Sequence, residues 1–282
     1  MPDQPSACDV ANDVRLTAQV APGVQIIVEG STDELLWGKF VDSRQRLAVA
    51  CNKEDALGAL AILEAADFRW AVAIVDADFM RIEGGALPSR NAFATDTHDA
   101  EMMMLRSAAL ERVLAEHHAC AQSPQRLPVQ RRERLLAIAE PLGALRLVSL
   151  RCGLALKFED LDPGKIRRAL RALVQYVLQH SGVSLTILEQ VAVATDEVLS
   201  AGHDPWELCC GHDVTLLLGH DLKGSLKGSD EDRARAVERE LRLAYDLAMF
   251  SVTGLCAALR WWEAEHPGYP LLRAADSSVG SG

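Results

Sequence analysis

Short apolar runs and helical segments alternate along the first half of the chain. Runs rich in Val, Ile and Ala predict strands at residues 24–28, 47–50, 71–75 and 91–94. The segments between and after them predict helices at residues 32–40, 54–66 and 98–116. Apolar strands without polar interruption, separated by helices, are typical of a parallel sheet that is covered on both faces. We therefore expect an α/β fold with a mostly parallel sheet flanked by helices.

The second half of the chain has a helical pattern. A segment rich in Gln, Ser and Pro interrupts the chain at residues 120–128, and residues 145–150 read as a last strand. Helices are then predicted at residues 164–180, 184–201, 206–219 and 231–262. We expect an α/β domain over residues 20–150, a helical domain over residues 160–265, and a flexible Ser/Gly-rich tail over residues 266–282.

Composition and charge narrow the class of protein. With 49% hydrophobic and 24% charged residues among 282, the chain is not a disordered one. Its formal net charge of −11 repels phosphate backbones, so nucleic-acid binding would need a local basic patch, a metal ion or a partner. The apolar stretch at residues 247–259 is too short for a membrane span, and no secretory signal is visible. Seven scattered cysteines without a C-x-x-C motif indicate a reduced, cytoplasmic protein.

Carboxylates follow three of the predicted strands. Glu29 follows the first, Asp76 and Asp78 follow the run at residues 71–75, and Asp96 follows the run at residues 91–94. The carboxyl ends of parallel strands share one edge of a sheet, where open α/β folds place their ligands. In an extended chain Asp76 and Asp78 would point the same way. Converging carboxylates repel one another unless protons or a cation compensate, and Mg²⁺ or Mn²⁺ is the natural partner.

Simpler roles are open for each of these acids. An acidic residue after a strand often caps a helix or lies in a solvated loop. Ser31 and Glu34 have the spacing of a capping box, and Asp33 in the first helical turn would favour the helix dipole. A capping role explains one carboxylate, however, and not a converging set.

Four segments carry a resemblance to a known family. The segments VEGSTDE at residues 28–34 and IVDADF at residues 74–79 resemble the TOPRIM domain of topoisomerases, primases and overcoming-lysogenization-defect nucleases. The segments ATDTHDAEMMML at residues 94–105 and CGHDV at residues 210–214 resemble a TOPRIM-like family of anti-phage nuclease effectors that accompany ABC-type ATPases. The similarity covers roughly residues 24–105 well and the helical remainder only in outline.

The resemblance implies metal-dependent hydrolysis of phosphodiester bonds. Glu29 would be a metal ligand or general acid/base, and Asp76 and Asp78 would hold Mg²⁺ or Mn²⁺. Asp33 would be an additional ligand, and Glu101, in the first turn of the next helix, a further catalytic candidate. The expected partners are a nucleic-acid substrate and an ABC-type ATPase of the same defence system, which would control a toxic nuclease.

Two other functions are compatible with the same residues. A haloacid-dehalogenase-like phosphatase also has an Asp-x-Asp after an apolar strand, but its motif leaves Glu29 unexplained and has small residues where Phe79 and Met80 stand. A non-catalytic TOPRIM-like sensor or scaffold would bind the ATPase through the helical half. The chain has no G-x-x-x-x-G-K-[ST] loop, so it does not itself look like an ATPase. The sequence leaves open DNA or RNA as substrate, and a homodimer as one oligomeric state.

One further set of metal-binding residue types lies late in the chain. His203, Cys209, Cys210, His212 and His220 carry atoms that zinc accepts. Their spacing matches no familiar zinc module, so no metal is expected from that spacing.

Overall fold

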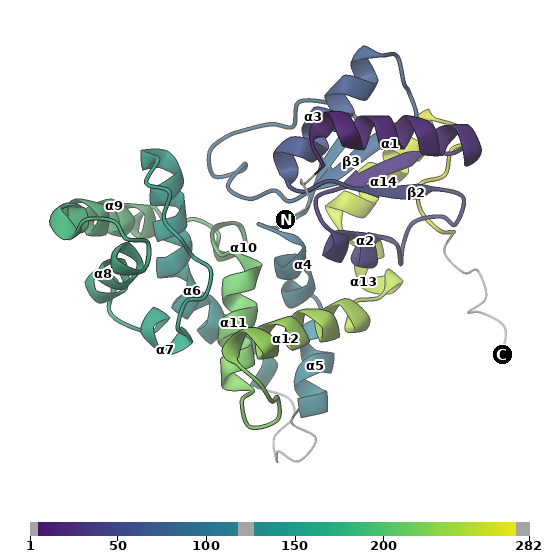
Figure 1. Ribbon diagram of the computed structural model, residues 1–282. Helices are drawn as coiled ribbons and strands as arrows, with labels where there is room; N and C mark the ends of the chain where they lie inside the picture. The colour runs from purple at the N-terminus through teal and green to yellow at the C-terminus, as the bar shows by residue number, and fades with distance from the viewer. Residues whose placement is uncertain (1–4, 118–126, 275–282) are drawn as a thin grey trace. The chain divides into compact units, whose positions relative to one another are not determined.

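The computed structural model describes residues 5–117 and 127–274, and these form two compact units (Figure 1). The first unit comprises the described residues of Met1–Ala77, Ala86–Asp96 and Asp246–Gly282. The second comprises those of Asp78–Gly85 and Thr97–Tyr245. Among the described residues, no helix has both the length and the apolar character needed to cross a membrane.

A four-stranded parallel sheet lies at the centre of the first unit. Its strands are β1 (Gln25–Val28), β2 (Arg46–Val49), β3 (Ala71–Val75) and β4 (Ala92–Ala94), in the spatial order β2-β1-β3-β4. In the register, Val28 of β1 lies opposite Val49 of β2 and Ile74 of β3. Every residue of β1 and β3 is buried, as expected for inner strands covered on both faces. The predicted α/β fold with a parallel sheet is confirmed.

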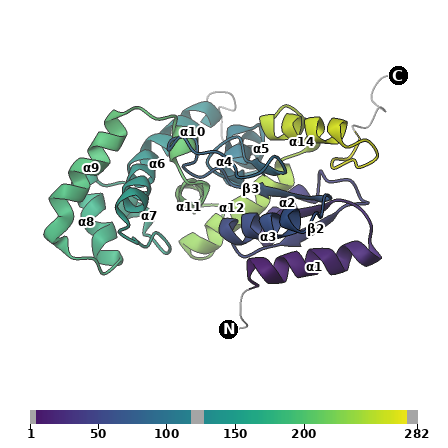
Figure 2. The ribbon, with the colours of Figure 1, turned by 90° about the horizontal axis from the view of Figure 1, so that it is seen from above.

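Helices cover both faces of this sheet. Helix α1 (Ala7–Val20) and helix α3 (Lys53–Ala65) pack on one face, and α14 (Gly254–Glu265) lies on the other (Figures 1 and 2). Leu60 and Leu63 of α3 are buried in the same core cluster as Ile27 of β1. Helix α2 (Ser31–Trp37) follows β1 directly, and Phe40 beyond it stacks on Phe250 of α13 (Leu247–Ser251), with ring centroids 4.5 Å apart.

The second unit is helical. Its longer helices are α4 (Ala100–Arg106), α5 (Ala109–His117), α6 (Leu127–Cys152), α8 (Leu170–His180), α9 (Leu188–Ser200), α11 (Gly211–Asp221) and α12 (Asp230–Ala244). Between them lie the short helices α7 (Pro163–Ile166), η1 (Leu185–Ile187) and α10 (Pro205–Leu208). Helix α11 packs against α4, α6 and α12, while α8 and α9 pack with α6. Helix α11 therefore brings segments that are distant in sequence into one core.

Several local predictions are wrong. Residues 145–150 form no strand but belong to α6, where Leu142, Leu145 and Val148 are buried at helical spacing. A short apolar run does not distinguish a strand from a buried helix by periodicity alone. The helix predicted at residues 231–262 is three helices, because Asp246 and Thr253 each begin a new one as N-caps. Helix α1 is an element that the sequence pattern did not lead us to expect.

The division into units also differs from the expected domains at residues 20–150 and 160–265. Helices α4, α5 and α6 group with the later helices, whereas residues after Asp246 return to the sheet. Trp262 of α14 anchors this return, since its Nε1 donates a hydrogen bond of 2.8 Å to Asn91 beside β4. The prediction of a flexible tail at residues 266–282 is wrong for its described part, because Leu271 and Leu272 are buried and Leu272 forms a bridge with Val41. Residues 275–282, and residues 118–126 of the expected break, lie outside the described residues.

Candidate functional site

Glu29 and Asp76 meet at the carboxyl edge of the sheet in the first unit. Glu29 follows β1 and Asp76 follows the neighbouring strand β3. Oε1 of Glu29 accepts a hydrogen bond of 2.7 Å from the main-chain amide of Asp76. Both residues are half-buried. The parallel topology thus brings these two sequence-predicted residues together.

Two residues that the sequence analysis did not single out, Thr95 and Lys53, also hydrogen-bond to the loop after β3. Thr95, just after β4, accepts a hydrogen bond of 2.9 Å at its Oγ1 from the amide of Ala77. Lys53 Nζ donates to the main-chain oxygen of Asp76 at 2.5 Å. Lys53 is the first residue of α3, directly after the N-cap Asn52, and this cap signal could have placed a cation at the sheet edge. The loop after β3 is therefore held from β1, β4 and α3.

Asp78 has a different backbone conformation from the one expected. Strand β3 ends at Val75, and Asp78 has a φ of 48° in the left-handed region. The alternation of an extended chain therefore does not set the directions of the Asp76 and Asp78 side chains, and that premise is wrong. The amide of Asp78 donates to the main-chain oxygen of His98 at 2.6 Å within the second unit. A non-glycine residue in this region costs roughly 1–3 kcal/mol and is often found where function requires it.

Two of the predicted acids have capping roles. Asp33 Oδ2 accepts a hydrogen bond of 3.0 Å from the amide of Gly30, the N-cap of α2. The expected pairing of Ser31 with Glu34 is wrong, because α2 begins one residue earlier than predicted. Asp96 accepts from the amides of Gly254 and Leu255, both at 2.7 Å, at the start of α14. Asp96 therefore stabilises a helix N-terminus.

Glu101 belongs to the second unit, in the first turn of α4, and is 7% exposed. Ligand atoms of Glu101, His212 of α11 and Glu238 of α12 all lie within 4.8 Å of one another. Nδ1 of His212 is 2.8 Å from Oε1 of Glu238, which also accepts from Thr215 Oγ1 at 3.0 Å. No local sequence pattern could predict that these residues meet, because more than a hundred positions separate Glu101 from the other two.

The charges of this pair are coupled. The hydrogen bond to Glu238 raises the pKa of His212 to about 10, and the nearby carboxylates of Glu101 and Asp99 add to the rise. Burial acts to raise the pKa of Glu238, but its hydrogen bond with His212 lowers that pKa overall. The imidazolium and the carboxylate therefore form an ion pair at neutral pH.

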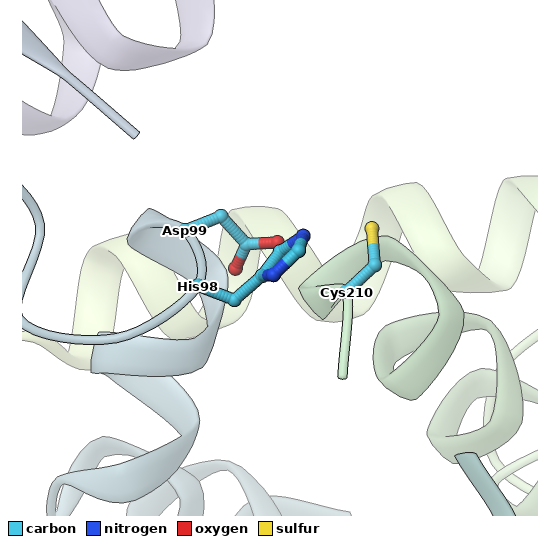
Figure 3. A group of neighbouring side chains, drawn as sticks. All are labelled: His98, Asp99 and Cys210. Atoms are coloured by element: carbon cyan, nitrogen blue, oxygen red, sulfur yellow. The ribbon is translucent and has the colours of Figure 1, made fainter. Parts of the chain in front are cut away.

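Asp99, which Figure 3 shows beside His98, links α4 to α11 through its two carboxylate oxygens. Its Oδ1 accepts from the amide of Met102 at 2.8 Å, and its Oδ2 accepts from the amide of Gly211 at 2.6 Å. A Cβ at Gly211 would lie 2.4 Å from both Asp99 Oδ1 and Glu101 Cβ, so only glycine permits this approach. The glycine of the CGHDV segment thus has a packing role.

His98, Asp99 and Cys210 form a second group of metal-binding residue types (Figure 3). Both oxygens of Asp99 already accept main-chain amides, and Nδ1 of His98 lies 3.0 Å from the main-chain oxygen of Glu207. Burial raises the pKa of Cys210, which keeps it a thiol, whereas metals bind the thiolate. This group is better explained as part of the packing between α4 and α11.

Two cavities open within the second unit. One, of about 590 Å³, is lined by Asp78, Phe79, His98, Phe158 and Arg146 among others. The other, of about 510 Å³, is lined by Arg146, His212 and Glu238, with Glu159, Asp160 and Glu231. The Arg146 guanidinium lies 4.2 Å from the Phe158 ring centroid and makes two hydrogen bonds, of 2.7 and 2.8 Å, to Asp213. Burial opposes the charge of Arg146, but Asp213 outweighs it and raises the pKa of the guanidinium.

Comparisons with known proteins do not assign this chain to a family. No protein-family model matches it, and no curated protein matches it either.

Proposed function

We propose that the protein is a metal-dependent nuclease of the TOPRIM type. The observation that carries the proposal is the contact between Glu29 and the loop of Asp76 at the carboxyl edge of the sheet. An acid after one strand, fixed against an Asp-x-Asp after its parallel neighbour, is the arrangement that the resemblance implies. The motif resemblance alone supports the further proposals, a toxic anti-phage effector controlled by an ABC-type ATPase.

The donor set at this edge fits Mg²⁺ or Mn²⁺. Glu29 and Asp76 offer carboxylate oxygens, which hard divalent cations prefer. Asp78, two residues further along the chain, is the third ligand proposed from the sequence. When bound, the ion lowers the pKa of a coordinated water molecule and neutralises charge on the phosphate. Asp33 is a weaker candidate, since it caps α2.

The chain's own residues add two functions to this site. Glu29 holds the loop after β3 through one carboxylate oxygen. Its carboxylate is also the group that would bind the metal or accept a proton. Lys53 places an ammonium group against the main chain of Asp76, and its positive charge would attract a phosphodiester. In the second unit, the cavity lined by Asp78 has the aromatic ring of Phe158 in its wall, a surface on which a base can stack.

The test is cleavage of labelled DNA and RNA by purified protein in Mg²⁺, Mn²⁺ or EDTA, with and without the ABC-type ATPase. We expect cleavage that EDTA abolishes and that Glu29→Gln reduces by about 10²-fold or more. Glu34→Gln is the matched control, because Glu34 is an exposed acid five residues away that caps nothing. Thermal unfolding of each variant separates a loss of activity from a loss of fold.

The alternatives give different results in the same experiment. A phosphatase with Asp76 as nucleophile would form a complex with beryllium fluoride and would tolerate Glu29→Gln. A scaffold would bind the ATPase and cleave nothing under any condition. Cleavage by Glu29→Gln at the wild-type rate would contradict the proposed site.

A further inference from the structure

The group formed by Glu101, His212 and Glu238 lies wholly within the second unit. Glu29 and Asp76 of the sheet edge belong to the first unit and are not part of this group. The three side chains come from three different helices, α4, α11 and α12. Glu101 is 7% exposed, and the Glu238 side chain is 12% exposed. The imidazole of His212, 66% exposed, lies toward solvent. A buried carboxylate, a partly buried carboxylate and an exposed imidazole therefore converge.

We propose that Glu101, His212 and Glu238 bind a divalent transition-metal ion, for which Zn²⁺ is the probe. Imidazole nitrogen with carboxylate oxygen is a donor set for Zn²⁺ and related ions rather than for Mg²⁺. Ligand atoms at bonds of roughly 2.0–2.2 Å in a tetrahedron lie about 3.4 Å apart. The spacings here, from 2.8 Å to at most 4.8 Å, bracket that value, so small side-chain movements would bring the three onto one ion.

The surroundings support an ion at this position. Thr215 donates to Oε1 of Glu238 and orients that carboxylate, as groups around metal ligands commonly do. The adjacent cavity of about 510 Å³ is lined by the further carboxylates Glu159, Asp160 and Glu231. Three protein ligands beside an open cavity leave coordination positions for water or a small anion.

The close approach of α11 to α4 creates this geometry. Without a Cβ, Gly211 lets α11 begin against Glu101, and the next residue, His212, is thereby placed beside Glu101 and Glu238. The plain alternative is an ordinary His212–Glu238 ion pair with Glu101 as a bystander. The chain contains a matched case of such a pair: His220 Nδ1 and Asp230 Oδ1, 3.0 Å apart, join the same two helices α11 and α12.

The experiment measures Zn²⁺ binding to chelator-stripped full-length chain that carries Glu29→Gln and Asp76→Asn. These two changes remove two of the three proposed sheet-edge ligands, Asp78 being the third, so the outcome does not depend on the proposed nuclease. We expect one Zn²⁺ per chain, with affinity lowered about tenfold or more by Glu101→Gln, His212→Asn or Glu238→Gln. His220→Asn should change the affinity less than about twofold. Equal losses in His212→Asn and His220→Asn, or no loss in either, would overturn the site.

Co²⁺ gives a second measurement, which reports on the atoms that bind the ion. The chain that carries Glu29→Gln and Asp76→Asn should show the visible absorption of Co²⁺ bound by nitrogen and oxygen, and adding His212→Asn should abolish it. His212 is exposed, so this variant is expected to fold, and its thermal midpoint without metal checks that. A Co²⁺ spectrum identical to that of the aqueous ion would overturn the proposal.

Discussion

Two buried acids of the second unit, Asp99 and Asp213, have identifiable hydrogen-bond partners. Asp99 accepts from the amides of Met102 and Gly211 and so caps one helix while it fixes the start of another. Asp213, with a side chain 4% exposed, is neutralised by the two hydrogen bonds from Arg146. Removing one partner of such a buried pair typically costs 3–5 kcal/mol, because a charge is left uncompensated. These residues determine the local geometry around the proposed metal site.

The His212–Glu238 pair predicts a pH dependence of stability in the presence of chelator. The pKa of His212 rises from 6.5 to about 10 on folding, so its contribution is fully present below pH 6.5 and is lost as the pH rises through 10. Because the imidazole is exposed and screened by solvent, we expect this contribution to be less than about 1 kcal/mol.

Urea unfolding of the wild type and of His212→Asn between pH 6 and pH 10 measures this contribution. The stability difference between the two proteins should shrink steadily over that range. A difference that stays constant across it would contradict the assigned ion pair.

Two glycines allow helices of the second unit to approach one another closely. Gly211 begins α11, and an added Cβ would meet Asp99 and Glu101 at 2.4 Å. Gly143 in α6 is a similar case, since a Cβ there would lie 2.4 Å from the main-chain oxygen of Leu208. Both glycines allow helices of the second unit to pack at distances that a larger residue prevents.

Gly211→Ala should therefore destabilise the protein by roughly 1–3 kcal/mol, the usual cost of overpacking. Gly224→Ala is the control, because a Cβ there meets nothing within 4 Å and its φ is not positive. This control should be neutral or slightly stabilising, since alanine reduces the freedom of the unfolded chain. Denaturant unfolding of both variants measures the difference, and equal stabilities would show that α11 can shift without cost.

The whole chain combines a parallel α/β unit with a helical one, and its polypeptide passes between the two units several times. The sheet unit contains Glu29 and Asp76, whereas Asp78 and Glu101 belong to the helical unit. The two proposed metal sites share no ligand residue, so they can be examined separately by substitution.

Mg²⁺ should raise the thermal midpoint of the protein, because the unfolded chain has no preformed site for it. At about 100 times the dissociation constant, binding adds ~2.7 kcal/mol, equivalent to roughly 5 °C for a chain of this size. Measured in a His212→Asn background, the shift should persist in Glu34→Gln and disappear when Glu29→Gln and Asp76→Asn are combined. A shift that survives this combination would place the ion elsewhere.

Much of the sheet unit could be predicted from the sequence alone. Its four strands follow from local runs of apolar residues, and the parallel arrangement follows from the helices between them. The meeting of Glu29 and Asp76 also follows, because neighbouring parallel strands end at the same edge. These features depend on residues close in sequence or on a rule of topology.

The remaining features depend on contacts between distant segments, which no local pattern contains. Residues 145–150 are helical because they continue α6, whose buried apolar face packs against neighbouring helices. Asp96 became the cap of α14 only because the chain after Asp246 returns to the sheet. Glu101, His212 and Glu238 converge only because Gly211 has no side chain to keep α11 away from α4. Tertiary packing alone decided these positions, since the free energy that sets them comes from contacts between residues tens to hundreds of positions apart.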